Sequence, residues 1–182
     1  MSVYVLRHEA RGRDVSYNST LTKQGLSYSI NLADRLKKLD IRTIYCSPFV
    51  RAIQTVHPYS VKNNVKINID YALIEYIAYP EMLDKSFNVT FTENELDYWN
   101  INPAYISSVK LADLSMGKNN LCEASSHVNY RTGEFLDVLK RYINCSEDNV
   151  LIVSHKATIC SLWRQIHGRD RELDMGEIDR LI

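Results

Sequence analysis

Three short apolar runs, each followed by polar residues and then by a helix-like segment, constrain this chain more than any other feature. The runs cover residues 3–6, 41–46 and 150–153 and are rich in residues that favour β-strands. Strands that alternate with helices form a mostly parallel sheet, because each parallel connection needs a crossover. We therefore expect an α/β fold, a three-layer sandwich with a mostly parallel central sheet and helices on both faces.

The two helices of the amino-terminal half have recognisable starts. Residues 22–39 place apolar side chains on one face of a helix, and Thr22 suits the N-cap. After the second strand, Ser47 suits an N-cap and Pro48 the first helical position, so a helix should begin there.

The remaining chain predicts further elements of the same fold. Residues 65–69 alternate polar and apolar residues like a half-exposed strand, and residues 123–142 and 156–167 are expected to be helices. The irregular, aromatic-rich residues 78–116 are expected to form an insertion with one or two short helices. We expect a single domain over residues 1–182, in which the insertion contributes to specificity.

Polar residues follow each of the three main strands. Arg7 and His8 end the first, residues 47–48 the second, and His155 the last, while Arg51 lies in the first turns of the second helix. The carboxyl ends of parallel strands share one edge, where α/β folds bind ligands. Two histidines and two arginines gathered there would repel one another unless an anion joined them. The pattern predicts a phosphate site.

Composition narrows the classes of partner. The chain has 182 residues, with 22 Lys and Arg balanced by 22 Asp and Glu, which favours neither nucleic acid nor an anionic membrane. No apolar stretch reaches the ~20 residues of a membrane helix, and the first residues do not resemble a signal peptide. The four cysteines are scattered without metal-ligand spacing, so we expect reduced thiols and a cytoplasmic location.

Taken in order, the motifs resemble one known family. They are L-R-H at residues 6–8, L-T-x-x-G at 21–25, S-P-x-x-R-A-x-Q-T at 47–55, and S-H at 154–155. Glu123-Ala124-Ser125 followed by Arg131 adds to the likeness. This series resembles the histidine phosphatase superfamily, which includes phosphoglycerate mutases and many phosphatases. The resemblance covers most of residues 3–170 and implies an enzyme that works without a metal or other cofactor.

The resemblance implies a catalytic set of His8, Glu75 and His155. His8 matches the nucleophile that takes the phosphoryl group, and a neutral imidazole can attack phosphorus in this way. Glu75 lies where the proton donor of the family usually lies, and it would protonate the departing alkoxide. Glu81 is a rival for that role, and the choice between the two stays open.

The same resemblance implies the groups that hold the phosphate. Arg7, Arg51 and His155 match residues that contact its oxygens. Arg11 matches an extra pocket arginine found in phosphatases related to suppressors of T-cell-receptor signalling, whose motif reads R-H-G-E-R where this chain reads R-H-E-A-R.

Two residues depart from the family pattern. Glu9 replaces a small residue after the first histidine, and a carboxylate there is unfavourable unless it points away or pairs with an arginine. Lys156 replaces a glycine after the second histidine, where it would either contact phosphate or be exposed. The chain also ends soon after the last helix, so we expect a sheet trimmed at that end.

We therefore expect a metal-independent phosphomonoester hydrolase that forms a phosphohistidine on His8. The alternatives are a mutase of the phosphoglycerate type and a catalytically weak phosphate-binding relative. The substrate would be a small molecule or a phosphoprotein, with no nucleic acid or membrane as partner, and the sequence predicts no particular oligomeric state.

Overall fold

A five-stranded sheet forms the centre of the molecule in a computed structural model that describes residues 1–78, 82, 90–114 and 123–182. The strand order is β3-β2-β4-β1-β5, and all pairs are parallel except β1 with β5. The strands are β1 (Val3–Arg7), β2 (Ile41–Cys46), β3 (Ile67–Ile69), β4 (Asn149–Ser154) and β5 (Ile178–Arg180). The predicted α/β fold with a mostly parallel sheet is confirmed.

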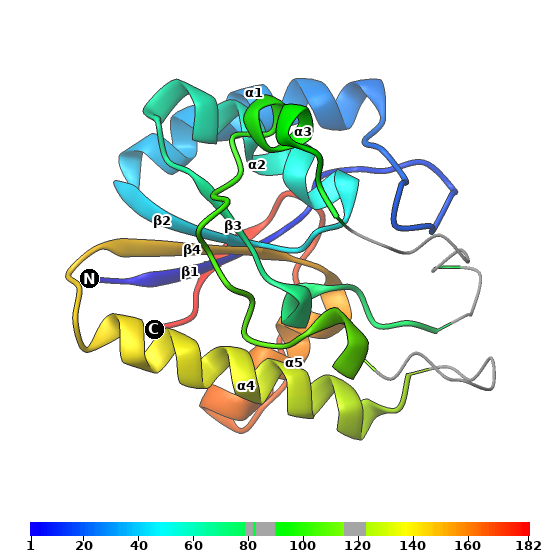
Figure 1. Ribbon diagram of the computed structural model, residues 1–182, viewed down its shortest axis with the longest axis vertical. Helices are drawn as coiled ribbons and strands as arrows, with labels where there is room; N and C mark the ends of the chain where they lie inside the picture. Colours follow the sequence, from blue (N-terminus) through cyan, green and yellow to red (C-terminus); the bar gives the residue numbers. More distant parts are fainter. Residues whose placement is uncertain (79–81, 83–89, 115–122) are drawn as a thin grey trace.

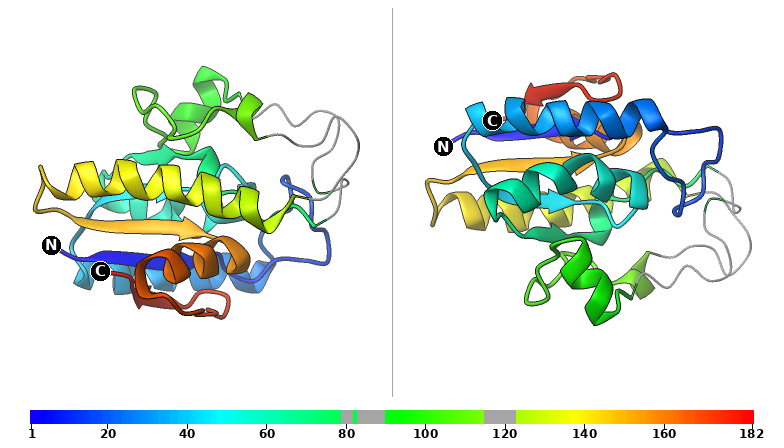
Figure 2. Two further views of the ribbon diagram at one scale, coloured as in Figure 1. Left: turned by 90° about the horizontal axis from the view of Figure 1, so that it is seen from below. Right: turned by 90° about the horizontal axis from the view of Figure 1, so that it is seen from above.

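Helices cover both faces of this sheet (Figure 1). One face carries α1 (Lys23–Lys38) and α2 (Val50–Asn63), which pack against each other, and the opposite face carries α4 (Ser125–Ile143) and α5 (Lys156–His167). Figure 2 shows the two helix layers from opposite sides. Each layer buries apolar side chains against the strands, so the sheet separates two cores.

The stretch predicted as an insertion contains short elements in its described part. These are α3 (Glu93–Tyr98), which begins with a capping box at Thr92, and the single-turn η3 (Leu111–Asp113).

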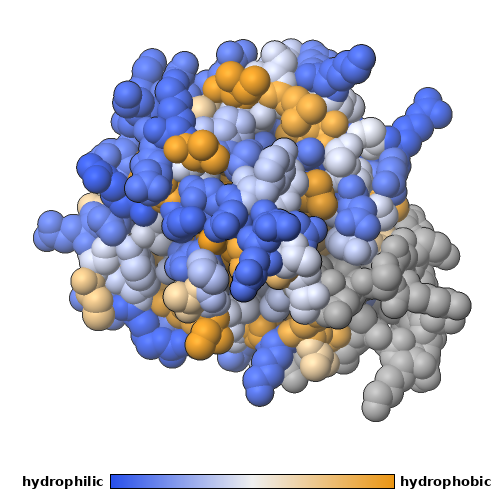
Figure 3. All heavy atoms as spheres, turned by 45° about the horizontal axis from the view of Figure 1, so that its top comes forward, coloured by the Kyte–Doolittle hydropathy of each residue, from blue (hydrophilic) through white to orange (hydrophobic). Residues whose placement is uncertain are grey.

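The surface seen in Figure 3 is largely hydrophilic, with hydrophobic residues in several patches. No helix in the part of the chain that the structure describes is both long and apolar enough to cross a bilayer.

The start of α2 differs from the prediction. The helix begins at Val50, and Phe49 takes the N-cap position without a side-chain hydrogen bond. Ser47 does not cap the helix, because its hydroxyl bonds the ring of His155 at 2.9 Å and accepts from the backbone N–H of Phe49 at 3.3 Å. The serine that looks like a helix cap therefore supports a histidine that follows another strand, β4.

The end of the chain also corrects the prediction, because the sheet is not trimmed there. Strand β5 pairs with β1, antiparallel, from Tyr4 opposite Arg180 to Leu6 opposite Ile178. A strand of three residues in a charged tail carries too little apolar pattern to be seen in the sequence.

Gly25 explains the spacing of the L-T-x-x-G motif. Thr22 at the start of α1 accepts from the Gly25 backbone N–H at 3.0 Å, and its own backbone N–H donates to the Ala10 carbonyl at 2.9 Å. Any Cβ at position 25 would overlap that carbonyl oxygen. The glycine thus lets α1 lie directly against the loop that follows His8, which fixes the loop beside the strand ends.

Candidate active site

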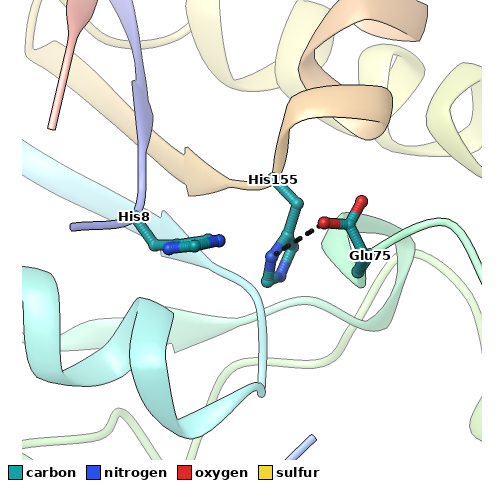
Figure 4. Close-up of side chains that lie close together, drawn as sticks. All are labelled: His8, Glu75 and His155. Carbon is teal, nitrogen blue, oxygen red and sulfur yellow. Dashed lines mark ion pairs between the residues drawn. The ribbon is translucent and has the colours of Figure 1, made fainter. Parts of the chain in front are cut away.

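His8 and His155 meet at the carboxyl edge of the sheet, as predicted. They follow β1 and β4, which are neighbours with Arg7 opposite Ser154 in the register. The ring centroids lie 5.1 Å apart at an interplanar angle of 61°, and the residues are 2% and 0% exposed. Figure 4 shows the His155 ring between His8 and Glu75.

A hydrogen bond to the backbone fixes the tautomer of His8. The Nδ1 atom lies 2.7 Å from the carbonyl oxygen of Glu9, which can only accept, so Nδ1 carries the proton and Nε2 keeps a lone pair. Burial, with smaller contributions from Arg51, Arg7 and Arg11, lowers the pKa of His8 to about 3. The ring is therefore neutral near pH 7, and its Nε2 is available as a nucleophile.

His155 is oriented by Ser47 and packs edge-on against Phe49, with ring centroids 5.0 Å apart. Its Nδ1 atom has no hydrogen-bond partner among the described residues and lies 3.7 Å from a carboxylate oxygen of Glu75. Burial and the charge of Arg51 lower the pKa of this histidine well below its ordinary value. The second ring is also neutral, with one nitrogen free to bind a ligand.

Glu75 lies just after the single-turn η1 (Tyr71–Leu73), and its side chain is 19% exposed. Burial raises the pKa of this carboxyl group, although a hydrogen bond from the backbone N–H of Tyr76 and the charges of Arg51 and Arg7 act in the opposite direction. A carboxyl group that stays protonated to a higher pH than usual is suited to give up a proton to a leaving group.

Arg7 and Arg51 supply positive charge without a carboxylate partner among the described residues. Arg51 is fully buried and donates to the Ser16 carbonyl at 2.9 Å, while Arg7 donates to the Leu173 carbonyl at 2.8 Å. The Nε atom of each is buried and has no hydrogen-bond partner in the described structure. Burial lowers the pKa of Arg51 to about 10, so it remains a cation. Two such guanidinium groups are suited to an oxyanion.

Arg11 lies close enough to affect the pKa values of His8 and Arg51, and it is held by the carbonyls of Gly12 and Asp14 at 2.9 and 2.8 Å. His8, Glu75 and His155 also present ligand atoms within 4.8 Å of one another, a set that could hold a metal ion. The neighbouring arginines oppose a cation there and favour an anion.

The structure shows where the side chains of Glu9 and Lys156 lie, the two residues that depart from the family pattern. The Glu9 carboxyl group lies against Gly176, where a Cβ would overlap it, and the charge that acts on it is that of Arg35. It therefore points away from the arginines of the site. Lys156 forms an ion pair with Glu172 at 2.7 Å, so the structure joins it to the carboxyl-terminal segment.

Glu123 and Arg131 belong to the site although the sequence gives them no role. Arg131 is fully buried and donates to Glu123 from Nε at 2.7 Å and from Nη2 at 3.2 Å. A third donor atom of Arg131, Nη1, bonds the Ala72 carbonyl, and Glu123 exchanges two hydrogen bonds with Ile77. The sequence signal for this pair is the motif Glu123-Ala124-Ser125 followed by Arg131, which resembles the family but carried no predicted role.

Side chains of β4 and α5 hold the same segment from the other side. The Ser154 hydroxyl donates to the Leu73 carbonyl at 2.8 Å, and the Thr158 hydroxyl donates to the Ile74 carbonyl at 2.5 Å. Together with Glu123 and Arg131, these bonds fix the backbone on both sides of Glu75. The carboxyl group is thus carried by a loop whose position is set by α4, β4 and α5.

Replacing Arg131 with methionine is expected to lower the free energy of unfolding by about 3–5 kcal/mol, because the buried carboxylate of Glu123 would lose its arginine partner and keep only His127 beside it. Urea unfolding measures the change. Arg141, exposed on the same helix, is a matched control, and its replacement with methionine should change stability by no more than about 0.5 kcal/mol. Equal effects of the two substitutions would contradict this role of Arg131.

The sequence profile of the histidine phosphatase superfamily (branch 1) matches residues 4–176, nearly the whole chain. The chain belongs to the histidine phosphatase superfamily. This membership agrees with the order of the four motifs and with the meeting of His8 and His155 at one sheet edge. No curated protein matches the sequence.

Solved structures of phosphatases share the fold of this member of the superfamily. The ecdysone phosphate phosphatase of Bombyx mori, solved with tungstate, is 15% identical with a TM-score of 0.70, covering 97% of this chain and 86% of that chain. A putative α-ribazole-5′-phosphate phosphatase of Escherichia coli is 18% identical with a TM-score of 0.70, covering 98% and 88%. Mycobacterial glucosyl-3-phosphoglycerate phosphatase is 14% identical with a TM-score of 0.65, covering 97% and 87%.

Proposed function

We propose that this histidine phosphatase hydrolyses phosphomonoesters without a metal, through a phosphohistidine formed on His8. The observation that supports the proposal is the pair of neutral imidazoles with ring centroids 5.1 Å apart, beside two arginines whose buried Nε atoms have no hydrogen-bond partner in the described structure. Phosphate monoesters carry the negative oxygens that such donors bind. Their hydrolysis is among the slowest uncatalysed reactions, so an enzyme must stabilise the negative charge of the transition state strongly.

In the first step, the lone pair on Nε2 of His8 attacks phosphorus in line with the leaving oxygen. The new P–N bond forms as the bond from phosphorus to the alcohol oxygen breaks, and Glu75 gives its proton to that oxygen. Arg7, Arg51 and the free Nδ1 side of His155 contact the equatorial oxygens, where negative charge must be stabilised. The products of this step are the free alcohol and phosphohistidine.

In the second step, Glu75 is a carboxylate and takes a proton from water. The water oxygen attacks phosphorus as the P–N bond breaks, which returns the lone pair to His8 and releases inorganic phosphate. Protons and charge balance over the two steps, because Glu75 loses one proton and regains it. Water therefore takes the place that a second phosphate acceptor takes in a mutase.

The function is tested by hydrolysis of p-nitrophenyl phosphate in the presence of EDTA, and the pH profile is measured on an alkyl phosphate, whose leaving oxygen needs a proton. For the alkyl phosphate we expect kcat/KM to rise as His8 loses its proton near pH 3 and to fall as pH passes the raised pKa of Glu75, since the neutral imidazole and the protonated carboxyl are the active forms. Hydrolysis only with added metal would contradict the proposal. Faster interconversion of phosphoglycerates than hydrolysis would favour the mutase, and phosphate binding without turnover would favour the weak relative.

A further inference from the structure

A groove of about 610 Å³ extends from the proposed catalytic residues across the surface. Its lining includes Arg7, Arg11 and Glu75, which form its phosphate end, together with side chains of α4, α5 and the carboxyl-terminal segment. Its size suits a small molecule. Because Glu75 would protonate the leaving oxygen, the rest of the groove is where the alcohol part of a substrate would lie.

Apolar side chains line much of this part of the groove. They come from separate segments of the chain: Val15, Ala78, Met82, Val128 and Ala157. Contact with such a surface stabilises an apolar ligand by about 25 cal/mol for each Å² removed from water. The hydroxyl of Ser125 and the amide of Asn129 add uncharged polar groups on the α4 side.

The described cations beyond the phosphate end are already paired. Lys156 contacts Glu172 at 2.7 Å, and the Nε atom of Arg164 contacts Asp170 at 2.5 Å. These four side chains all line the groove and contribute no net charge to it. A second anionic group on a substrate would therefore compete with a carboxylate for each cation and gain little from binding there.

We infer that the preferred substrates are phosphomonoesters of uncharged, largely apolar alcohols, an inference that rests on the proposed hydrolase function. The apolar lining stabilises the alcohol part, Ser125 and Asn129 accommodate a hydroxyl group, and the paired cations offer nothing to a second anion. Substrates whose alcohol part carries a second anion into the groove are disfavoured for the same reason.

The test compares three esters of primary alcohols: ethyl phosphate, 3-phenylpropyl phosphate and 4-phosphooxybutanoate, with p-nitrophenyl phosphate as a general substrate. We expect kcat/KM for the phenylpropyl ester to exceed that for the ethyl ester by about 10- to 100-fold, since a buried aromatic group contributes about 1.5–3 kcal/mol. The carboxylate ester should be no better than the ethyl ester. A carboxylate ester that is the best of the three would overturn the inference while leaving the hydrolase function intact.

Releasing a groove cation provides a second measurement. Glu172→Gln frees Lys156 and should raise the ratio of kcat/KM for the carboxylate ester to that for the phenylpropyl ester by up to about 5-fold. Asp137→Asn is the matched control, because it breaks another exposed pair, with Lys140, that does not line this groove, and its ratio should stay unchanged. An unchanged ratio in Glu172→Gln would overturn the inference. If the wild-type enzyme hydrolysed neither these esters nor p-nitrophenyl phosphate, the hydrolase function on which the inference rests would be refuted.

Discussion

Replacing His8 with alanine is expected to lower kcat for p-nitrophenyl phosphate by about 10⁴-fold or more, a loss of the size seen when a covalent nucleophile is removed from other enzymes. The reason is that Nε2 of His8 is the atom proposed to bond phosphorus, and Nδ1 is committed to the Glu9 carbonyl at 2.7 Å. Quenching the wild-type enzyme during turnover of labelled substrate should trap acid-labile phosphohistidine, and the variant should trap none.

Phosphate binding separates this chemical role from a structural one. His8→Ala should still bind inorganic phosphate or vanadate, because Arg7 and Arg51 keep their carbonyl anchors at Leu173 and Ser16. His167→Ala, at an exposed histidine, serves as the control and should retain full activity and labelling. Undiminished labelling of His8→Ala would place the nucleophile elsewhere, and a wild type that binds phosphate but never becomes labelled would be a binding relative.

Replacing Glu75 with glutamine is expected to separate substrates by their leaving groups. An alkyl phosphate needs a proton on its departing oxygen, so its kcat/KM should fall by about 10²- to 10⁴-fold, the usual contribution of general acid catalysis. p-Nitrophenolate leaves without a proton, so formation of phosphohistidine from p-nitrophenyl phosphate should fall far less. Burst kinetics on the two substrates measure this first step directly.

The same variant also tests the pH profile. If Glu75 supplies the proton, Glu75→Gln should lose the fall in activity at higher pH while keeping the rise near pH 3 that belongs to His8. Glu81→Gln is the comparison, at a residue outside the described part of the chain. Equal losses on good and poor leaving groups in Glu75→Gln, with a selective loss in Glu81→Gln, would transfer the acid role to Glu81.

Local sequence patterns determined the strands of the sheet other than β5, and the placement of the polar residues that follow them. The runs that became β1, β2 and β4 are visible because burial on both faces demands continuous apolar residues. Parallel pairing then brings the residues after each strand to one edge, so the meeting of His8 and His155 followed from the order of elements. The motifs added the family and a role for each residue.

Only the tertiary structure decided which partner each polar side chain takes. Ser47 bonds His155 instead of capping α2, Glu9 turns toward Gly176, and Lys156 pairs with Glu172. Apolar periodicity reports which face of an element is buried, but it does not report the direction of a polar side chain or a partner far away in the chain. For that reason the sequence by itself determined the edge of the sheet at which the site lies. Packing between distant segments determined the hydrogen bonds that hold the loop of Glu75 and the net charge of the groove beside it.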